Sequence, residues 1–83
     1  PDYWDHATLL ELAVLGRDEA AAAEVLPPAL AAVRAAWEPE TTARNLGLIR
    51  AARARRGESL SWAEEVERQF RRAVAAMHHA YRL

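Results

Sequence analysis

Residues 62–81 carry the feature that most constrains the fold, an apolar side chain at every third or fourth position. The members of this stripe are Trp62, Val66, Phe70, Ala73, Met77 and Ala80. Steps of three and four follow the 3.6-residue turn of an α-helix, so the stripe lies on one helical face and the charged residues lie on the others. The stripe predicts an amphipathic helix over 62–81 that packs on other helices. Ser61 and Glu64 have the spacing of a capping box, which places the start of this helix.

The same period predicts three earlier helices, over residues 3–15, 19–36 and 39–56. We expect Asp2 and Asp18 to cap the first two helices and Gly16 to end the first. Almost every side of the first helix is apolar, so we expect neighbours to cover it on several sides. The second helix contains Pro27 and Pro28, which lack the N–H that a helix interior uses, and we expect a kink or a restart at Pro28.

Composition supports a small helical domain. The chain has 83 residues, a length that suits a single domain with a modest core. Alanine, the strongest helix former, occupies 20 of these positions. Because the connections are short, neighbouring helices should run antiparallel. We therefore predict an all-α fold, an antiparallel four-helix array of two helical hairpins, in one domain over residues 1–83. Since the chain begins with Pro1, we also expect it to be a fragment of a larger multi-domain protein.

The net charge of -1 is the sum of two opposed halves. Residues 1–40 hold two Arg and eight acidic residues, whereas residues 41–83 hold nine Arg and four acidic residues. The halves attract each other or a second copy, so a homodimer is one expected assembly. The longest stretches without Asp, Glu or Arg, Val25–Val33 and Ala73–Tyr81, are far shorter than the roughly 20 residues of a spanning helix. We expect a cytoplasmic domain with no membrane partner, and the lack of cysteine fits a reducing compartment.

Three histidines and two serines are the candidates for metal binding or nucleophilic chemistry. They are His6, His78, His79, Ser59 and Ser61. Adjacent histidines on a helix point about 100° apart, whereas a chelating pair needs the spacing i and i+4. The serines fit helix starts better than a strained nucleophile elbow, and the glycines form no phosphate loop. We expect no metal, no cofactor and no enzymatic activity.

Six arginines of the second half form a candidate interaction surface: Arg50, Arg53, Arg56, Arg68, Arg71 and Arg72. Arginine is prominent in phosphate contacts, so such a surface could attract nucleic acid. However, Glu64, Glu65 and Glu67 can pair with the same arginines, and the overall charge is slightly negative. Nucleic-acid binding is therefore a less favoured alternative to protein binding.

The three tryptophans, Trp4, Trp37 and Trp62, each lie at or near the end of a predicted helix. Tryptophan is enriched in interface hot spots. A large ring at a helix end also closes a core, and for each tryptophan taken alone we favour the core.

The opening run is a more specific signal, and it reads Tyr3-Trp4-Asp5-His6-Ala7-Thr8-Leu9-Leu10-Glu11. Later in the chain follow Trp37, Thr41, Thr42, Asn45, Leu46 and Ile49. Over residues 2–56 this pattern resembles the TRAFs-binding domain of apoptosis-signal-regulating MAP3 kinases and its bacterial relatives. The first two helices also resemble a tetratricopeptide unit, with Leu9, Ala13, Ala22, Leu26 and Ala29 at its apolar positions.

The resemblance implies a tetratricopeptide-like helical region that holds partner proteins and performs no reaction. Similar bacterial domains look like parts of larger signalling or defence proteins. The family-motif positions that carry over are Tyr3, Trp4, Asp5, Thr8, Glu11, Trp37, Thr42 and Asn45. The aromatic pair at 3 and 4 would fill space between helices, and the polar side chains at 8 and 11 would bridge to Thr42 and Asn45.

We therefore expect a non-enzymatic module for protein–protein interaction, acting as a scaffold or regulatory part of a larger signalling or defence protein. Small helical repeats stack on neighbours because one unit cannot bury its faces alone. The partner would be another protein, a neighbouring domain of the same chain or a second copy. The main alternative is a structural spacer or clamp between effector domains.

Overall fold

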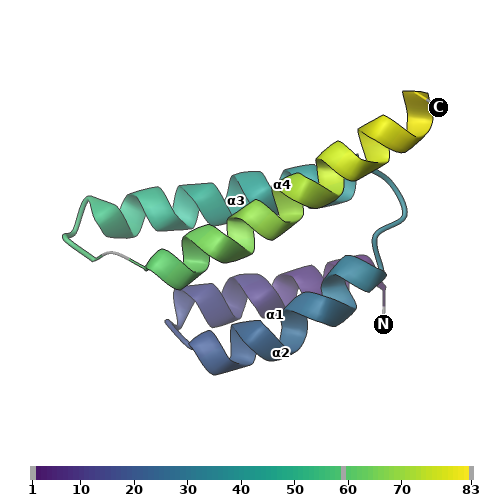
Figure 1. Cartoon of the computed structure of the whole chain (residues 1–83). Helices are drawn as coiled ribbons and strands as arrows, with labels where there is room; N and C mark the ends of the chain where they lie inside the picture. Colours follow the sequence, from purple (N-terminus) through teal and green to yellow (C-terminus); the bar gives the residue numbers. More distant parts are fainter. Residues whose placement is uncertain (1, 59, 83) are drawn as a thin grey trace.

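The computed structural model describes residues 2–58 and 60–82, with side chains described as far as residue 79, and these residues form four α-helices. The helices are α1 (Tyr3–Leu15), α2 (Glu19–Ala31), α3 (Trp37–Ala54) and α4 (Ser61–Arg82). No strand occurs within the described ranges. The predicted all-α fold is confirmed, with α1 and α2 forming one hairpin and α3 and α4 the other (Figure 1).

The two hairpins stack so that α1 packs beside α3 and α2 beside α4. The resulting body measures 43 × 25 × 15 Å. Helices α1 and α3 run in the same direction, because Tyr3 bonds near the start of α3 and Leu15 bonds near its end. Figure 1 shows the C-terminal turns of α4, in yellow, diverging from the first hairpin. Because α1 and α3 run in the same direction, their N-terminal ends lie at the same end of the molecule.

The core is built mainly from small side chains. Its buried members are Tyr3, Ala7, Leu10, Ala13, Val14, Ala22, Ala29, Ala43, Leu46, Ala63, Val66 and Phe70. Alanine loses no side-chain rotamer freedom on burial and lets helix backbones approach closely. The larger side chains of Phe70, Leu10 and Leu46 fill the space that remains. So much alanine in the interior leaves little room for an internal cavity.

Helix α1 begins and ends where the sequence predicts. The Asp2 carboxylate accepts from the Asp5 amide at 3.1 Å, and the Asp5 carboxylate accepts from the Asp2 amide at 3.1 Å, forming a capping box. Gly16 is the C-cap. The prediction that α1 is covered on several sides is wrong for its outer side. There Leu9 and Leu12 are exposed by 55% and 58%, because α1 packs mainly on α2 and α3.

The second predicted helix, 19–36, is too long, because α2 ends at Ala31. Residues 32–36 form a turn that the buried carboxylate of Glu38 holds by accepting from the amides of Arg34 and Ala35, at 2.7 and 3.1 Å. Helix α3 then begins at Trp37 and not at the predicted residue 39. Pro39 therefore lies in the first turn, where a backbone N–H has no intrahelical partner to lose.

Helix α2 runs through Pro27 and Pro28, so the expected restart at Pro28 is wrong. Both prolines are exposed. The carbonyl groups that they leave unpaired belong to Ala23 and Glu24, which are exposed as well. Water can therefore replace the missing hydrogen bonds, and the helix continues.

The start of α4 differs from the predicted capping box. Ser61 is the first helical residue, and the Glu64 amide donates to the Leu60 carbonyl at 3.3 Å. Ser61 therefore lies inside the helix and does not cap it. Along the predicted stripe, Val66 and Phe70 are buried. The remaining described members, Trp62, Ala73 and Met77, are half-buried, and the Ala80 side chain lies outside the described part.

Candidate protein-interaction surface

The contact between α1 and α3 is anchored by a buried pair of hydroxyl groups. Tyr3 and Thr42 are 3% and 0% exposed. The Tyr3 hydroxyl lies 2.5 Å from the Thr42 Oγ1 and donates to the Glu38 carbonyl at 3.2 Å. Accepting from Thr42 while donating to Glu38 satisfies the Tyr3 hydroxyl in both directions. Burial raises the pKa of Tyr3 to about 12, so the phenol stays protonated and holds the two helices in register.

Two further contacts continue this register along the outer edge. The rings of Trp4 and Trp37 lie 5.5 Å apart between centroids, and Trp4 also packs edge-on against Tyr3 at 5.0 Å. Farther along, the Asn45 Nδ2 donates to the Glu11 Oε2 at 3.4 Å. The Trp4–Trp37 and Glu11–Asn45 contacts join α1 to α3 at matching positions along the two helices, whereas the Trp4–Tyr3 contact lies within α1. The two helices thus present one composite surface.

The outward side of this contact, which we call the α1–α3 face, exposes large apolar side chains. They are Trp4 at 36%, Leu12 at 58%, Leu15 at 47%, Trp37 at 59% and Leu48 at 65%. The expectation of a core position is therefore wrong for Trp37, while the ring of Trp62 is half-buried. Trp37 is exposed because it opens α3 on the side facing away from Leu46 and the core.

A cleft of about 320 Å³ lies at the end of this face opposite the tryptophans. Its lining consists of Leu15, Leu48, Ile49, Ala52, Arg53 and Arg56. The Arg53 guanidinium donates to the backbone carbonyl of Leu15 and to the Glu58 carboxylate. Glu58 also accepts from Arg17, at 2.9 Å. These bonds tie the C-terminal ends of α1 and α3 together, so the cleft has firmly held walls.

A family model described as the MAP3K TRAFs-binding domain matches residues 1–71. The chain belongs to this family. The match covers α1, α2, α3 and the first half of α4, and so extends beyond the predicted 2–56. No curated protein and no solved structure matched the chain. Because the family is named for protein binding, its assignment makes protein–protein interaction the general role of the domain.

The TRAFs-binding motif positions gather at the contact between α1 and α3. Tyr3, Trp4 and Glu11 each touch a motif residue or its neighbour on α3. Asp5 serves the cap of α1. Thr8 is exposed and the Thr42 hydroxyl bonds to Tyr3, so the expected bridge from Thr8 to Thr42 is wrong. Sequence reasoning missed Leu12, Leu15 and Leu48, which carry no motif. Their signal was present, since Leu48 lies off the helical face that contains Ala43, Leu46 and Ile49.

Three of the six candidate arginines, Arg50, Arg68 and Arg71, line one pocket together with Glu64 and Glu67. Arg50 and Arg71 both pair with Glu67, Arg68 pairs with Glu65, and Arg53 pairs with Glu58. Arg56 lines the cleft of the α1–α3 face. Arg72 lies on the exposed side of α4. Four of the six guanidinium groups are therefore paired within the domain, and those of Arg50 and Arg53 join two helices.

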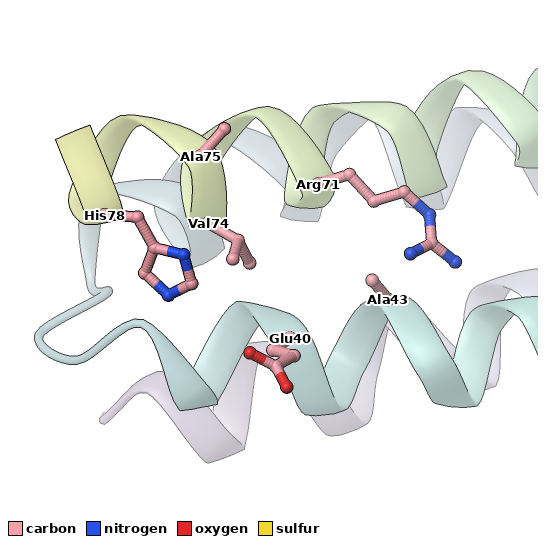
Figure 2. A pocket seen from close by; sticks show the side chains of 6 residues that line it. All are labelled: Glu40, Ala43, Arg71, Val74, Ala75 and His78. Atoms are coloured by element: carbon pink, nitrogen blue, oxygen red, sulfur yellow. The ribbon is translucent and has the colours of Figure 1, made fainter.

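A second cavity, of about 450 Å³, lies between the start of α3 and the end of α4. Figure 2 shows Glu40 on α3 facing His78 and Val74 on α4. The lining contains no aromatic side chain apart from the imidazole, and Val74 is its largest apolar residue. The cavity therefore offers a weaker apolar anchor than the α1–α3 face.

The described residues offer neither a metal site nor a membrane-spanning helix. Nowhere in the described ranges do three His, Cys, Asp or Glu side chains group in a way that could hold a metal ion. Among the described helices, none has both the length and the apolar character to cross a bilayer. The α1–α3 face is thus the best candidate site for the domain.

The buried hydroxyl pair gives a stability prediction. Tyr3→Phe should lower the free energy of unfolding by about 1–3 kcal/mol, because a buried polar group loses its partner. Thr42→Val should have a similar effect. In the double variant, the loss of unfolding free energy should be about 1 kcal/mol smaller than the sum of the two single losses, because the second substitution removes a group that is already unpaired. Urea denaturation of all four proteins measures this coupling, and strictly additive losses would contradict the assigned hydrogen bond.

Proposed function

We propose that this domain is a non-enzymatic protein-binding module and that its partner docks on the α1–α3 face. The observation that carries the proposal is the exposure of Trp37, Leu48 and Leu12 on two helices held in fixed register. Several large apolar side chains exposed on one face of a domain mark a candidate interaction surface. Tryptophan is also among the residues most enriched in binding hot spots.

The face is preorganised for binding. Buried hydroxyl groups fix one end of the α1–α3 contact, and the Arg53 bond to the Leu15 carbonyl fixes the other. Beside the hydroxyl groups, Trp4 packs against Trp37 and limits the rotamers that its ring can adopt. A surface that is already ordered loses less conformational entropy when a partner binds, so more of the contact energy appears as affinity.

The proposal includes a cellular role as a scaffold or regulatory part of a larger signalling or defence protein in the cytoplasm. The partner would be a separate protein or a neighbouring domain of the same chain. The family name, MAP3K TRAFs-binding domain, makes TRAF proteins one class of partner to test. In this role the domain positions other proteins and performs no reaction itself.

Site-specific photo-cross-linking tests the face. A benzophenone amino acid placed at Leu48, in the full-length protein within its own cells, should form a discrete adduct with a protein partner. The matched control carries the same residue at Ala23, which is exposed on α2. We expect the adduct at position 48 and none at position 23. Identical adducts from both positions, or adducts from position 23 alone, would contradict docking on the α1–α3 face.

Self-association is a second candidate role, favoured by the acidic first half and the arginine-rich second half. Sedimentation of the isolated chain tests this role. A strictly monomeric species at high micromolar concentration would argue against self-assembly. The spacer or clamp role predicts that an unrelated bundle of similar length can replace the domain, whereas a binding module cannot be replaced in this way.

A further inference from the structure

We propose that the segment that docks on the α1–α3 face is an acidic amphipathic helix, with apolar anchors and with carboxylates near the Leu48 end. This inference rests on the proposed function, because it names the chemistry of the partner for that same face. It follows from the charges around the cleft and from the distance between the apolar anchors.

Arginines surround Leu48 without carboxylate partners. Arg44 lies four residues before Leu48, and Arg55 lies seven residues after it. These two arginines therefore lie on the same side of α3 as Leu48. Arg56 lines the cleft itself. Within the described part of the chain, none of these three arginines has a carboxylate oxygen within 4.0 Å. All three are exposed, so a partner can reach them.

Two acidic residues near this end are already engaged, whereas Glu40 lines a pocket with Arg44 and Leu48 one turn earlier on α3. Glu58 accepts from both Arg17 and Arg53, at 2.9 and 3.0 Å. Asp18 accepts from the amide of Ala21 at the start of α2. The unpaired guanidinium groups therefore give the Leu48 end of the face a positive potential, which acts over roughly a Debye length of about 8–10 Å in physiological salt.

The opposite end of the face has a different charge. Asp2 and Asp5 lie beside the tryptophans at the N-terminus of α1, where they form the capping box. Glu11, farther along α1, is bonded to Asn45. The face is thus polarised, with carboxylates near Trp4 and guanidinium groups near Leu48. A docked segment would be oriented by this polarity, with its own carboxylates at the Leu48 end.

The spacing of the anchors sets the length of the docked segment. Trp37 and Leu48 are eleven residues apart on one helix, which corresponds to about 16 Å. Three turns of a partner helix span about the same distance. A partner helix with apolar side chains at its two ends, and with Asp or Glu beside the second, would place its anchors on the tryptophan pair and in the cleft.

Selection from a display library of random peptides of about 16 residues tests the inference. The 83-residue chain is the bait, and peptides that still bind its Leu48→Asp variant are removed. We expect the remaining peptides to combine Leu, Phe or Trp with Asp or Glu. Their affinity, measured by fluorescence anisotropy, should fall about tenfold or more in the double variant Arg55→Glu with Arg56→Glu.

The control is Arg72→Glu, which reverses an exposed charge on α4 away from the face and should change the affinity less than about twofold. Raising the NaCl concentration from about 0.05 to 0.5 M should weaken binding to the unmodified chain more than binding to the double variant. These two results together would support an acidic partner.

The outcomes separate the two proposals. If the recovered peptides need Leu48 for binding but have neutral or basic flanking residues, the proposal of an acidic partner is wrong and the proposal of the docking face stands. Failure to recover any peptide that depends on Leu48 would remove the docking face as well. A dimer that Leu48→Asp dissociates in sedimentation would assign the face to a second copy, and so would also overturn the acidic helix.

Discussion

Glu67→Ala is expected to lower the free energy of unfolding by about 2–3 kcal/mol, because it leaves two guanidinium groups without their shared partner. The Glu67 carboxylate is 7% exposed and accepts from the Arg50 Nε at 2.9 Å and from the Arg71 Nη2 at 2.7 Å. These bonds join α3 to α4. The arginines are partly exposed and can be rehydrated, which keeps the loss below that of a fully buried pair.

The matched control for this variant is Glu65→Ala on the same helix. Glu65 is 47% exposed and pairs with Arg68 at 2.7 Å on the surface of α4. Its removal should change the free energy of unfolding much less than the removal of Glu67, because water and salt screen an exposed ion pair. Urea denaturation compares the two variants directly. Equal losses would show that the cluster of Glu67, Arg50 and Arg71 adds no more stability than an ordinary surface ion pair.

Gly47 belongs to the same cluster. A Cβ atom at this position would lie 3.2 Å from the Glu67 Oε1, so the missing side chain makes room for the carboxylate. This contact explains a glycine in the middle of α3, where it would otherwise be unfavourable by about 1 kcal/mol relative to alanine.

The same cluster predicts a dependence of stability on pH. Burial acts to raise the pKa of Glu67, but the hydrogen bonds and charges of Arg50 and Arg71 outweigh it and hold that pKa below its ordinary value. A lowered folded-state pKa gives stability that is complete above the unfolded-state pKa of about 4.3 and is lost as pH falls through the folded-state pKa. Thermal unfolding between about pH 7 and pH 3 should therefore show a smaller acid-induced loss in Glu67→Ala than in the unmodified chain. Parallel curves would contradict this assignment.

Trp37→Ala combined with Leu48→Asp is expected to abolish partner binding while leaving the domain folded. Each hot-spot substitution typically loses about 2 kcal/mol of binding free energy or more, which corresponds to about thirtyfold in affinity. The two positions lie about 16 Å apart, so the losses should nearly add and reach several hundredfold.

The fold should tolerate both changes, because the two side chains are 59% and 65% exposed. The free energy of unfolding should fall by about 1 kcal/mol or less, mostly through the lost contact between Trp37 and Trp4. Circular dichroism and urea denaturation check this point. The control variant, Ala23→Asp on the exposed side of α2, should retain full binding.

The helices were predictable from the sequence because their apolar period and the caps at Asp2 and Asp18 are local signals. The end of α2 was not, because Glu38 caps residues 34 and 35 from the next helix. Ser61 shows the same limit, since a capping pattern can occur one residue away from the real helix start. The apolar period therefore places the helices, and hydrogen bonds in the connecting segments, which the period does not show, set their ends.

The site was predictable in part. The family motif identified Tyr3, Trp4 and Trp37 as candidate site residues, and the structure shows that these residues join α1 to α3. The arginine pattern predicted pairing with Glu67, but could not show that this carboxylate is buried between two helices. The position of Leu48 off the apolar face of α3 indicated that its side chain is exposed, but the pattern of one helix could not show that Leu15 lies beside it across the α1–α3 contact.

Titration of the partner identified by cross-linking at position 48 tests the proposed face most directly. Isothermal calorimetry would compare the unmodified protein, the Trp37→Ala and Leu48→Asp double variant, and the Ala23→Asp control. We expect the double variant to lose affinity by about a hundredfold or more while the control keeps it. Unchanged affinity in a double variant that remains folded would show that the partner binds elsewhere and that the α1–α3 face is not the binding site.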